Sequence, residues 1–232
     1  MSLRLSDSLH IGGVAVTTVI KKHVQLDLNS AGRAKFEIVT EQEPSGVVEL
    51  HIGYELTNMT PYFIGVIESK QQANGRWYLT CRELLGALTF QSALSIRHAT
   101  INQVLTTLDN RLEFVTPNAS YMQTTLPMFC HAGAGIQALK QIGQCWQIPE
   151  FIYQQRSDGK IFVGSWQHSQ WAQTIIDDYP EHSIKTTSST SGEVIAIPKL
   201  RPGLKLNGRY IHEVTLQNDR MQIRWSNTLS GG

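Results

Sequence analysis

Residues 64–81, IGVIESKQQANGRWYLTC, predict two β-strands joined by a tight turn. Apolar and polar side chains alternate on both sides of the dipeptide Asn74-Gly75, a pattern that is typical of half-buried strands. Asn and Gly are the residues that best tolerate the positive φ angles required at both central positions of a type I′ turn. The stretch therefore predicts a β-hairpin.

Similar turns recur along the chain. Asp158-Gly159 and Asn207-Gly208 each lie between alternating apolar and polar residues, and each predicts another tight hairpin. A further hairpin is expected to turn at Asn218-Asp219. Hairpins at this frequency predict a mainly β protein with a few inserted helices.

The first ninety residues contain closely spaced strand patterns. Residues 14–20 are rich in β-branched side chains, and apolar residues alternate with polar ones in 24–28, 34–38 and 48–54. Clusters of turn-forming residues separate these segments. Such an arrangement predicts a small barrel or a sandwich.

A helical pattern interrupts the strands in the middle of the chain. Thr100 and Gln103 have the spacing of a capping box, and apolar residues then recur at helical intervals from Ile101, so a helix is predicted there. A second helix is predicted at 135–145 and a third, short one at 83–88. Beyond them, the polar stretch KTTSSTSG is expected to be a mobile linker before the last hairpins.

The composition argues against a highly charged partner. The 232 residues include 41% hydrophobic and 17% charged residues, with a formal net charge of +1. This charge gives no electrostatic reason to expect binding to nucleic acid or to an anionic membrane. A net charge near zero also offers little protection against self-association, which suits an obligate assembly.

The cysteines and the N-terminal sequence suggest where the protein is made. Cys81, Cys130 and Cys145 have no metal-binding spacing and cannot all pair within one chain, so reduced thiols are expected. The N-terminal stretch MSLRLSDSLHIGG lacks the apolar core of a signal peptide, and no segment approaches the ~20 apolar residues of a membrane span. We expect a protein that is synthesised in the cytoplasm and does not insert into a membrane.

One short motif is similar to a cofactor-binding fingerprint. Residues 133–138 fit the dinucleotide pattern G-x-G-x-x-A, which requires a preceding strand and an acidic residue about 20 positions later. Pro127 is expected to interrupt the strand, and Glu150 and Asp158 lie outside any βαβ pattern. A glycine-rich entry into a helix is predicted instead.

Two further pairs are candidates for catalysis. Cys130 and His131 are adjacent, but neighbours on a strand point to opposite faces, so a buried thiol beside a loop histidine is expected. Asp177 and Asp178 are expected to form a solvated strand end, because paired catalytic carboxylates need a set separation across a cleft.

The eight histidines show no metal-binding spacing. No catalytic, cofactor-binding or metal-binding residue is assigned, no cofactor is expected, and the protein is predicted not to be an enzyme.

Aromatic residues are the remaining candidates. The five tryptophans could stack on sugars or bases, but in strands they are more often core or interface anchors. We therefore select as candidate interface or core anchors Trp77, Tyr78, Trp166 and Trp225.

Several segments, taken in order, resemble the hub proteins of contractile phage tails. These are the Mu-like 43 kDa tail protein and the late control gene D family, which are related to the hub portion of type VI secretion spike proteins. The segments that carry the likeness are AGRAKF (31–36), YFIGVI (62–67) with CRELL (81–85), IGQCWQIP (142–149) with DGKIFVG (158–164), and LRPG (200–203) through MQIRW (221–225).

The resemblance implies an α+β, mainly β fold with two related β-barrel-like modules and inserted helices. The expected divisions are 1–95 for the first module, 96–184 for a helix-containing second module, and 185–232 for a linker and returning hairpins that complete the modules. The resemblance also implies a homotrimer whose six modules form a pseudo-hexameric ring. This ring would join the tail tube protein to the spike protein in the virion baseplate, without specific nucleic-acid binding. The chain would be synthesised in the cytoplasm of the bacterial host.

Two other functions stay open. A tail-associated cell-wall hydrolase would need a credible catalytic set of residues, for which Asp177 or Cys130 are the available candidates. A carbohydrate-binding tail module would use exposed tryptophans.

Overall fold

The hairpin predicted at Asn74-Gly75 forms a long arm of a 13-stranded sheet in the computed structural model, which describes residues 5–54 and 58–229. Residues 1–4 of the N-terminal stretch discussed above lie outside the described part. The strands of the large sheet are β1 (Ser6–Ile11), β2 (Val14–Val16), β3 (Thr18–Asp27), β4 (Arg33–Val39), β5 (Val47–Gly53), β6 (Thr60–Ala73), β7 (Arg76–Glu83), β13 (Ile175–Ile176), β14 (Lys185–Ser188), β15 (Ser191–Ile195), β16 (Lys205–Leu206), β17 (Arg209–Gln217) and β18 (Arg220–Ser226).

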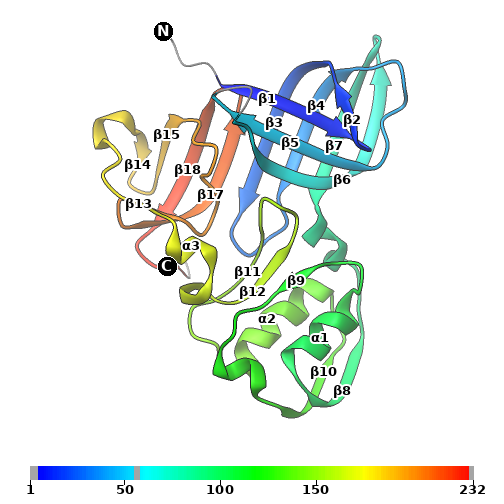
Figure 1. Cartoon of the computed structure of the whole chain (residues 1–232), viewed down its shortest axis with the longest axis vertical. Coiled ribbons are helices and arrows are strands. Elements are labelled where there is room, and N and C mark those ends of the chain that lie inside the picture. The colour runs from blue at the N-terminus through cyan, green and yellow to red at the C-terminus, as the bar shows by residue number, and fades with distance from the viewer. Residues whose placement is uncertain (1–4, 55–57, 230–232) are drawn as a thin grey trace.

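The two ends of the chain share this sheet. Its main path runs β14-β15-β18-β17-β3-β4-β7-β6-β5-β1-β2, and β13 and β16 join it beside β17. The antiparallel pairing of β17 with β3 brings the C-terminal hairpins beside the N-terminal ones, as Figure 1 shows in orange and blue. Among the described residues the path is open at β14 and β2, so it does not close into a barrel.

The large sheet folds over its own core. β6 pairs with β5 along its first half and with β7 along its second, and its register shifts between Ile67 and Ser69. Such a bulge bends a strand, and the bend is consistent with β5 and β1 lying over β4 and β7 (Figure 1). Phe36 of β4 and Phe63 of β6 meet edge to face with ring centroids 6.4 Å apart.

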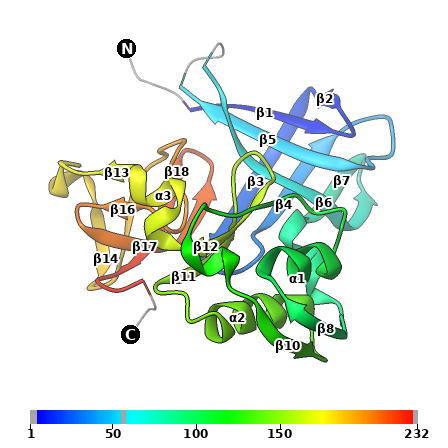
Figure 2. The same ribbon diagram turned by 60° about the horizontal axis from the view of Figure 1, so that its bottom comes forward.

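A smaller unit carries most of the helices, and Figure 2 shows α1 and α2 beside the β8–β10 pair. It has its own hydrophobic core, which includes Val104, Leu139 and Phe129. Its elements are η1 (Leu84–Thr89), β8 (Leu94–Ala99), α1 (Ile101–Leu108), β9 (Phe114–Val115), η2 (Ser120–Gln123), β10 (Leu126–His131), α2 (Gly135–Cys145), β11 (Phe151–Gln155) and β12 (Ile161–Ser165). The short helices η3 (Trp166–His168), α3 (Gln170–Gln173) and η4 (Glu181–Ser183) lead back to the large sheet.

Two of the three dipeptide turns form as predicted. Both residues of Asn74-Gly75 and of Asn207-Gly208 have positive φ. The prediction of a tight two-residue turn at Asp158-Gly159 is wrong in type, although β11 and β12 do form a hairpin. There only Gly159 has a positive φ, and Arg156 N–H bonds to the Lys160 carbonyl at 2.7 Å, so the loop is one residue longer.

The helix predictions are confirmed. α1 begins after Thr100 with the capping box that the sequence predicts, and α2 covers residues 135–145. The short helix expected at 83–88 is the 3₁₀ helix η1, displaced by one residue.

The prediction of a mobile linker in residues 185–192 is wrong. This segment contributes to the β14–β15 hairpin at one edge of the large sheet. Small polar residues are suitable there because β14 is exposed along its whole length.

The fold is mainly β, as the sequence predicts. The division into two barrel-like modules, with boundaries after residues 95 and 184, stays a prediction.

A buried ion pair connects the loop between β15 and β16 to the junction between the large sheet and the smaller unit. Arg201, which is 4% exposed, donates to Glu83 Oε1 at 2.7 Å and to the Gln155 carbonyl at 3.1 Å. Glu83 Oε2 accepts the Gly32 N–H at 2.8 Å. Burial raises the pKa of Glu83 above its usual value, although Arg201 acts in the opposite direction. The pair therefore links residues of the large sheet with β11 of the smaller unit.

Two buried amides complete this junction. Gln155 accepts the Leu85 N–H at 3.0 Å and donates to the Ile64 carbonyl at 2.8 Å. Beside it, Gln154 accepts the Asn29 N–H, and Asn29 accepts the Tyr153 N–H, both at 2.9 Å. The side chains thus satisfy backbone N–H groups at the junction, where an unsatisfied buried group costs about 1–3 kcal/mol.

Removing one partner of the buried pair should destabilise the protein strongly. We expect Arg201→Met to lower the free energy of unfolding by about 3–5 kcal/mol, because it leaves Glu83 buried without its cation. The double variant Arg201→Met/Glu83→Gln should be more stable than the single one, because glutamine is neutral and can still accept the Gly32 N–H. Urea unfolding measures both.

The exposed pair of Lys160 and Glu113 provides the control. Lys160→Gln should change the free energy of unfolding by about 1 kcal/mol or less. If Arg201→Met costs no more than this control, the buried pair does not hold the junction.

Candidate interaction surfaces

The outer face of the large sheet is polar because its strands alternate. In β4, Ala34, Phe36 and Ile38 are buried in the core, which places Lys35 on the opposite face. The register continues this arrangement across the sheet, since Lys35 lies opposite His23 of β3 on one side and opposite Thr80 of β7 on the other.

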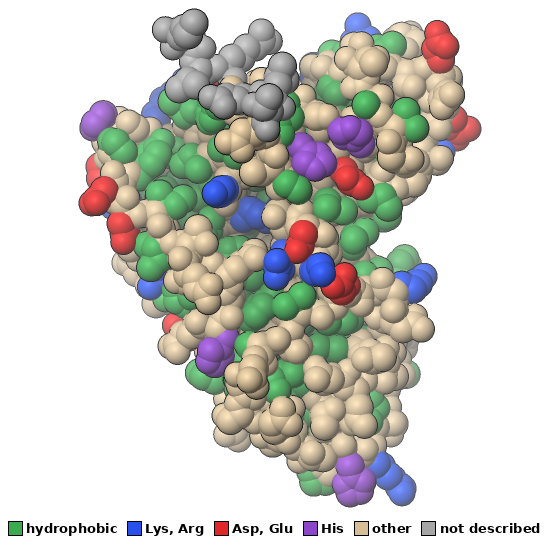
Figure 3. Space-filling model, in the orientation of Figure 1, with side chains coloured by type: hydrophobic (Ala, Val, Ile, Leu, Met, Phe, Trp, Pro, Cys, Tyr) green, Lys and Arg blue, Asp and Glu red, His purple; other side chains and the backbone are tan. Residues whose placement is uncertain are grey.

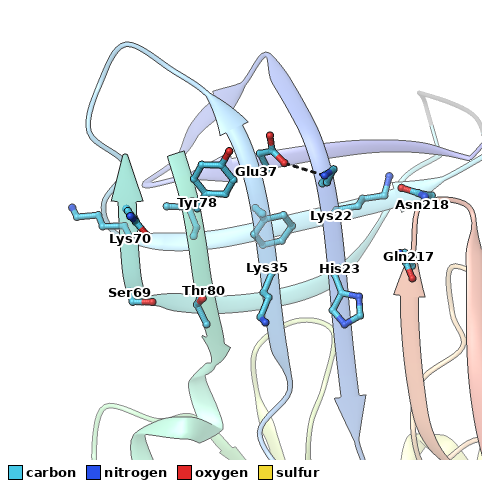
Figure 4. A pocket seen from close by; sticks show the side chains of 14 residues that line it. Lys22, His23, Lys35, Glu37, Ser69, Lys70, Tyr78, Thr80, Gln217 and Asn218 are labelled. Atoms are coloured by element: carbon cyan, nitrogen blue, oxygen red, sulfur yellow. Dashed lines mark ion pairs between the residues drawn. The ribbon is translucent and has the colours of Figure 1, made fainter. Parts of the chain in front are cut away.

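A pocket of about 620 Å³ lies on this outer face, over β3, β4, β6, β7 and the end of β17. In Figure 4 the side chains of His23 and Thr80 lie on the same side of the sheet as that of Lys35, and those of Tyr78 and Glu37 form an adjacent row. Four of the nine lysines in the sequence line this pocket, namely Lys21, Lys22, Lys35 and Lys70. We call it the basic pocket.

Glu37 is the one acidic residue in the lining of the basic pocket. It accepts a hydrogen bond from Arg76 at 2.5 Å, and Lys21 Nζ lies 3.6 Å from its other oxygen. The hydrogen bond from Arg76 lowers the pKa of Glu37, so this carboxylate is held in its charged form. Because one carboxylate serves two cations, the cluster keeps a positive charge.

Two carboxylates face each other further along the outer face. Asp27 of β3 lies opposite Glu213 of β17, and Gln25 donates to Glu213 at 3.1 Å. Burial raises the pKa of Asp27, and the neighbouring charge of Glu213 raises it further.

The four candidate anchor residues lie in different environments. Trp166 and Trp225 are 7% and 8% exposed and belong to the large core, where Trp166 Nε1 donates to the Gly203 carbonyl at 2.7 Å. Trp77 is partly buried and packs against the same core. Tyr78 is 40% exposed and lines the basic pocket.

Cys130 and His131 do not form a catalytic pair. The expectation of a buried thiol is wrong, because Cys130 is exposed on β10 and its Sγ lies 3.8 Å from Ser95 Oγ. His131 ends the strand rather than lying in a loop, and its ring nitrogens bond to Gln141 Oε1 at 3.0 Å and to the Ala134 carbonyl at 2.9 Å. In β10, Met128 and Cys130 are exposed while Phe129 between them is buried, so one face of the β8–β10 ribbon is in solvent.

The structure also shows where the remaining sequence motifs lie. Asp177 and Asp178 are both exposed, and α2 begins at Gly135, as expected for a glycine-rich helix entry. The expectation that Pro127 interrupts the preceding strand is wrong, because β10 forms and an edge strand tolerates a missing N–H. Residues 5–54 and 58–229 contain no group of three or more His, Cys, Asp or Glu side chains that could hold a metal ion. Within these ranges no helix is both long and apolar enough to cross a membrane.

An apolar groove was not predicted from the sequence. It has a volume of about 620 Å³, and Phe90, Val66 and Leu112 line it together with charged residues such as Arg82 and Arg111. Phe90 is 76% exposed and Val66 43%. Figure 3 shows the outline of the molecule hollowed on its right side, between the large sheet and the smaller unit. Phe90 follows η1 and gave no distinctive signal, since isolated apolar residues in loops are common.

A sequence relative and several solved structures are similar to this chain. No protein-family model matches it. The "Uncharacterized 58.7 kDa protein in lys 3'region" of Haemophilus phage HP1 is 32% identical over 197 residues, which are 84% of this chain and 37% of that protein. The chain thus spans little more than a third of the length of that phage protein.

The structural similarity extends over almost the whole chain. The tail protein from Neisseria meningitidis MC58 has a TM-score of 0.67 at 14% identity, covering 96% of both chains. The 43 kDa tail protein of prophage MuSo2 from Shewanella oneidensis has a TM-score of 0.68 at 10% identity, covering 96% of this chain and 98% of that one. The E. coli c3393 protein, a type VI secretion component, has a TM-score of 0.63 at 12% identity, covering 94% of this chain and 76% of that one.

The fold is that of phage tail proteins. At these identities the similarity establishes the fold and leaves the site residues to be argued from this chain itself.

The raised pKa of Asp27 leads to a prediction about pH. A carboxyl whose pKa is higher in the folded state contributes stability below its unfolded value of 3.8, and this contribution is lost as the pH rises through the folded value. Asp27→Asn should therefore increase the free energy of unfolding at pH 7 more than at pH 3.5. Urea titrations at the two pH values measure the difference.

Asp219→Asn removes one negative charge at the exposed tip between β17 and β18 and serves as the control. An equal pH dependence in the two variants would contradict the role assigned to the burial of Asp27.

Proposed function

We propose that this chain is a structural subunit of the tail of a phage, a prophage or a phage-like contractile injection system. In this proposal three copies close into a ring in which six barrel-like modules are arranged with pseudo-hexameric symmetry. The ring is the hub of the baseplate and joins the tail tube protein to the spike protein. Its work is assembly and involves no catalysis.

The structural similarity to phage tail proteins, which extends over almost the whole chain, supports this proposal. Both the Neisseria tail protein and the MuSo2 43 kDa tail protein match 96% of this chain and almost their own full length. The E. coli protein is described as a component of the type VI secretion system with structural similarity to the T4 tail proteins gp27 and gp5, which supports a place beside a spike. The HP1 relative adds a phage protein at the level of sequence.

The surface offers material for contacts between subunits. Several large apolar side chains are exposed, including Val14 at 63%, Ile195 at 51% and Phe90 at 76%. Stable assemblies bury about 1,200–2,000 Å² or more per interface, with aromatic and aliphatic anchors at the centre. Among the candidate anchors, Tyr78 is exposed enough to serve at a contact, while Trp166 and Trp225 serve the core in this proposal.

A ring of three copies predicts a definite mass in solution. Light scattering on the purified chain should give about 78 kDa, three times the chain mass of 26.0 kDa, and the value should persist on dilution to micromolar concentration. A mass near that of one chain at micromolar concentration would contradict the ring.

The two alternatives are tested separately. A tail-associated hydrolase would release peptidoglycan fragments, and Asp177→Asn or Cys130→Ser would abolish the turnover. A carbohydrate-binding module would bind glycans on an array as a monomer. The hub proposal expects neither result.

A further inference from the structure

A row of hydrogen-bond donors crosses the floor of the basic pocket. The register places Gln217, His23, Lys35, Thr80 and Ser69 opposite one another on five successive strands, β17, β3, β4, β7 and β6. Figure 4 shows these five side chains in one line, at the same height along the strands. Neighbouring strands lie about 4.8 Å apart, so the row extends over about 19 Å. We call it the donor row.

The donor row is available to a ligand. Among the described residues, Lys35 has no acidic side chain within ion-pair distance, and it is exposed. The side chains of His23, Thr80 and Ser69 make no hydrogen bonds to other residues in the described part of the chain. Groups that fold into such a row without partners are hydrated in the free protein, and a ligand with acceptor oxygens can replace that water.

The charges around the row favour an anion of low charge. Lys22 is paired with Asp7, and Lys70 lies 2.6 Å from Glu43, so these two lysines are neutralised locally. Two positive charges remain without a compensating carboxylate. One is Lys35, and the other comes from the cluster in which Lys21 and Arg76 share the single carboxylate of Glu37. Two uncompensated charges are too few for duplex nucleic acid, which typically engages several phosphates at once.

The shape of the site favours an extended ligand. A single small anion would contact two or three neighbouring positions of a row that spans five strands. A polypeptide in extended conformation covers about 19 Å with about six residues and directs every second side chain towards the sheet. At the donor row β17, β3, β4 and β7 are each paired on both sides, so a segment that crosses these four strands cannot add to a free edge and has to be held by side chains.

We propose that the basic pocket binds an acidic, extended polypeptide segment of a partner protein. Its carboxylates accept hydrogen bonds from Lys35 and from the neighbouring His23 and Thr80, while the ring of Tyr78 packs against the aliphatic part of the segment. The proposal does not depend on the number of copies in the assembly, and the basic pocket shares no lining residue with the apolar groove at Phe90.

The test uses the 232-residue chain and a fluorescent eight-residue peptide with glutamate at every second position. Fluorescence anisotropy measures its affinity at physiological ionic strength. The same peptide with glutamine in place of glutamate is the ligand control. Lys35→Gln removes the central cation of the row, Lys35→Arg retains its charge, and Lys185→Gln removes one exposed lysine from β14, outside the pocket.

The proposal predicts a specific pattern of affinities. Lys35→Gln should weaken binding of the glutamate peptide about tenfold, which corresponds to the loss of one charge-assisted hydrogen bond. Lys35→Arg should bind within about threefold of the natural chain, Lys185→Gln should bind like it, and the glutamine peptide should bind at least as weakly as Lys35→Gln binds the glutamate peptide. Because Lys35 is exposed, its substitution should not disturb folding. Melting temperatures equal to that of the natural chain check that each variant is folded.

Three outcomes would overturn the proposal. The first is no binding of the glutamate peptide at millimolar concentration. The second is an equal loss in Lys35→Gln and Lys185→Gln, which would mean attraction to general surface charge. The third is tighter binding of an anionic oligosaccharide than of the peptide, which would assign the pocket to a glycan.

Discussion

The buried contact between Arg201 and Glu83 is the interaction on which the arrangement of this protein depends. It brings the loop between β15 and β16, the end of β7 and strand β11 to one point in the interior. Each ion would be costly to bury alone. Here Glu83 accepts hydrogen bonds from Arg201 and from the Gly32 N–H, and Arg201 also donates to the Gln155 carbonyl. Gln154, Gln155 and Asn29 extend the same junction. The large sheet and the smaller helical unit are therefore held by polar groups that fit in one geometry, rather than by apolar contact alone.

This junction has a consequence for the surfaces. With the smaller unit fixed against β6 and β7, the outer face of β3, β4 and β7 stays uncovered and forms the basic pocket, while the apolar groove at Phe90 lies where the two units meet. The basic pocket is polar with a small excess of positive charge, and the apolar groove is lined by apolar side chains together with charged residues. The proposed tail subunit would need such distinct surfaces, because each of its contacts has to exclude the wrong partner.

The sequence predicted those features that depend on neighbouring residues. The turns at Asn74-Gly75 and Asn207-Gly208, and the capping box at Thr100, form because their chemistry is local. The loop at Asp158-Gly159 was predicted with the wrong turn type, because the choice between two and three loop residues depends on the strand register. The segment 185–192 resembles a linker in composition, yet it pairs with β18 through β15, an effect of tertiary structure on a weak local preference.

The candidate sites were harder to predict for the same reason. Arg201 lies 118 residues from Glu83, and neither residue has a local pattern that indicates burial. The donor row is composed of side chains from five strands, so it exists only once their register is known. Trp166 and Trp225 could be selected as anchors from their type, but whether they face the core or the surface depends on the way the sheet curves.

Hydrogen–deuterium exchange of two backbone amides tests the central claim, that the polar junction holds the two units as one cooperative structure. The Gly32 and Leu85 N–H groups are bonded to the side chains of Glu83 and Gln155. The account predicts that these two amides exchange as slowly as the central amides of β4, because all of them open only when the whole structure unfolds. Exchange of Gly32 and Leu85 at rates near those of exposed loops, with β4 and β12 both still protected, would show that the two units separate independently and would contradict it.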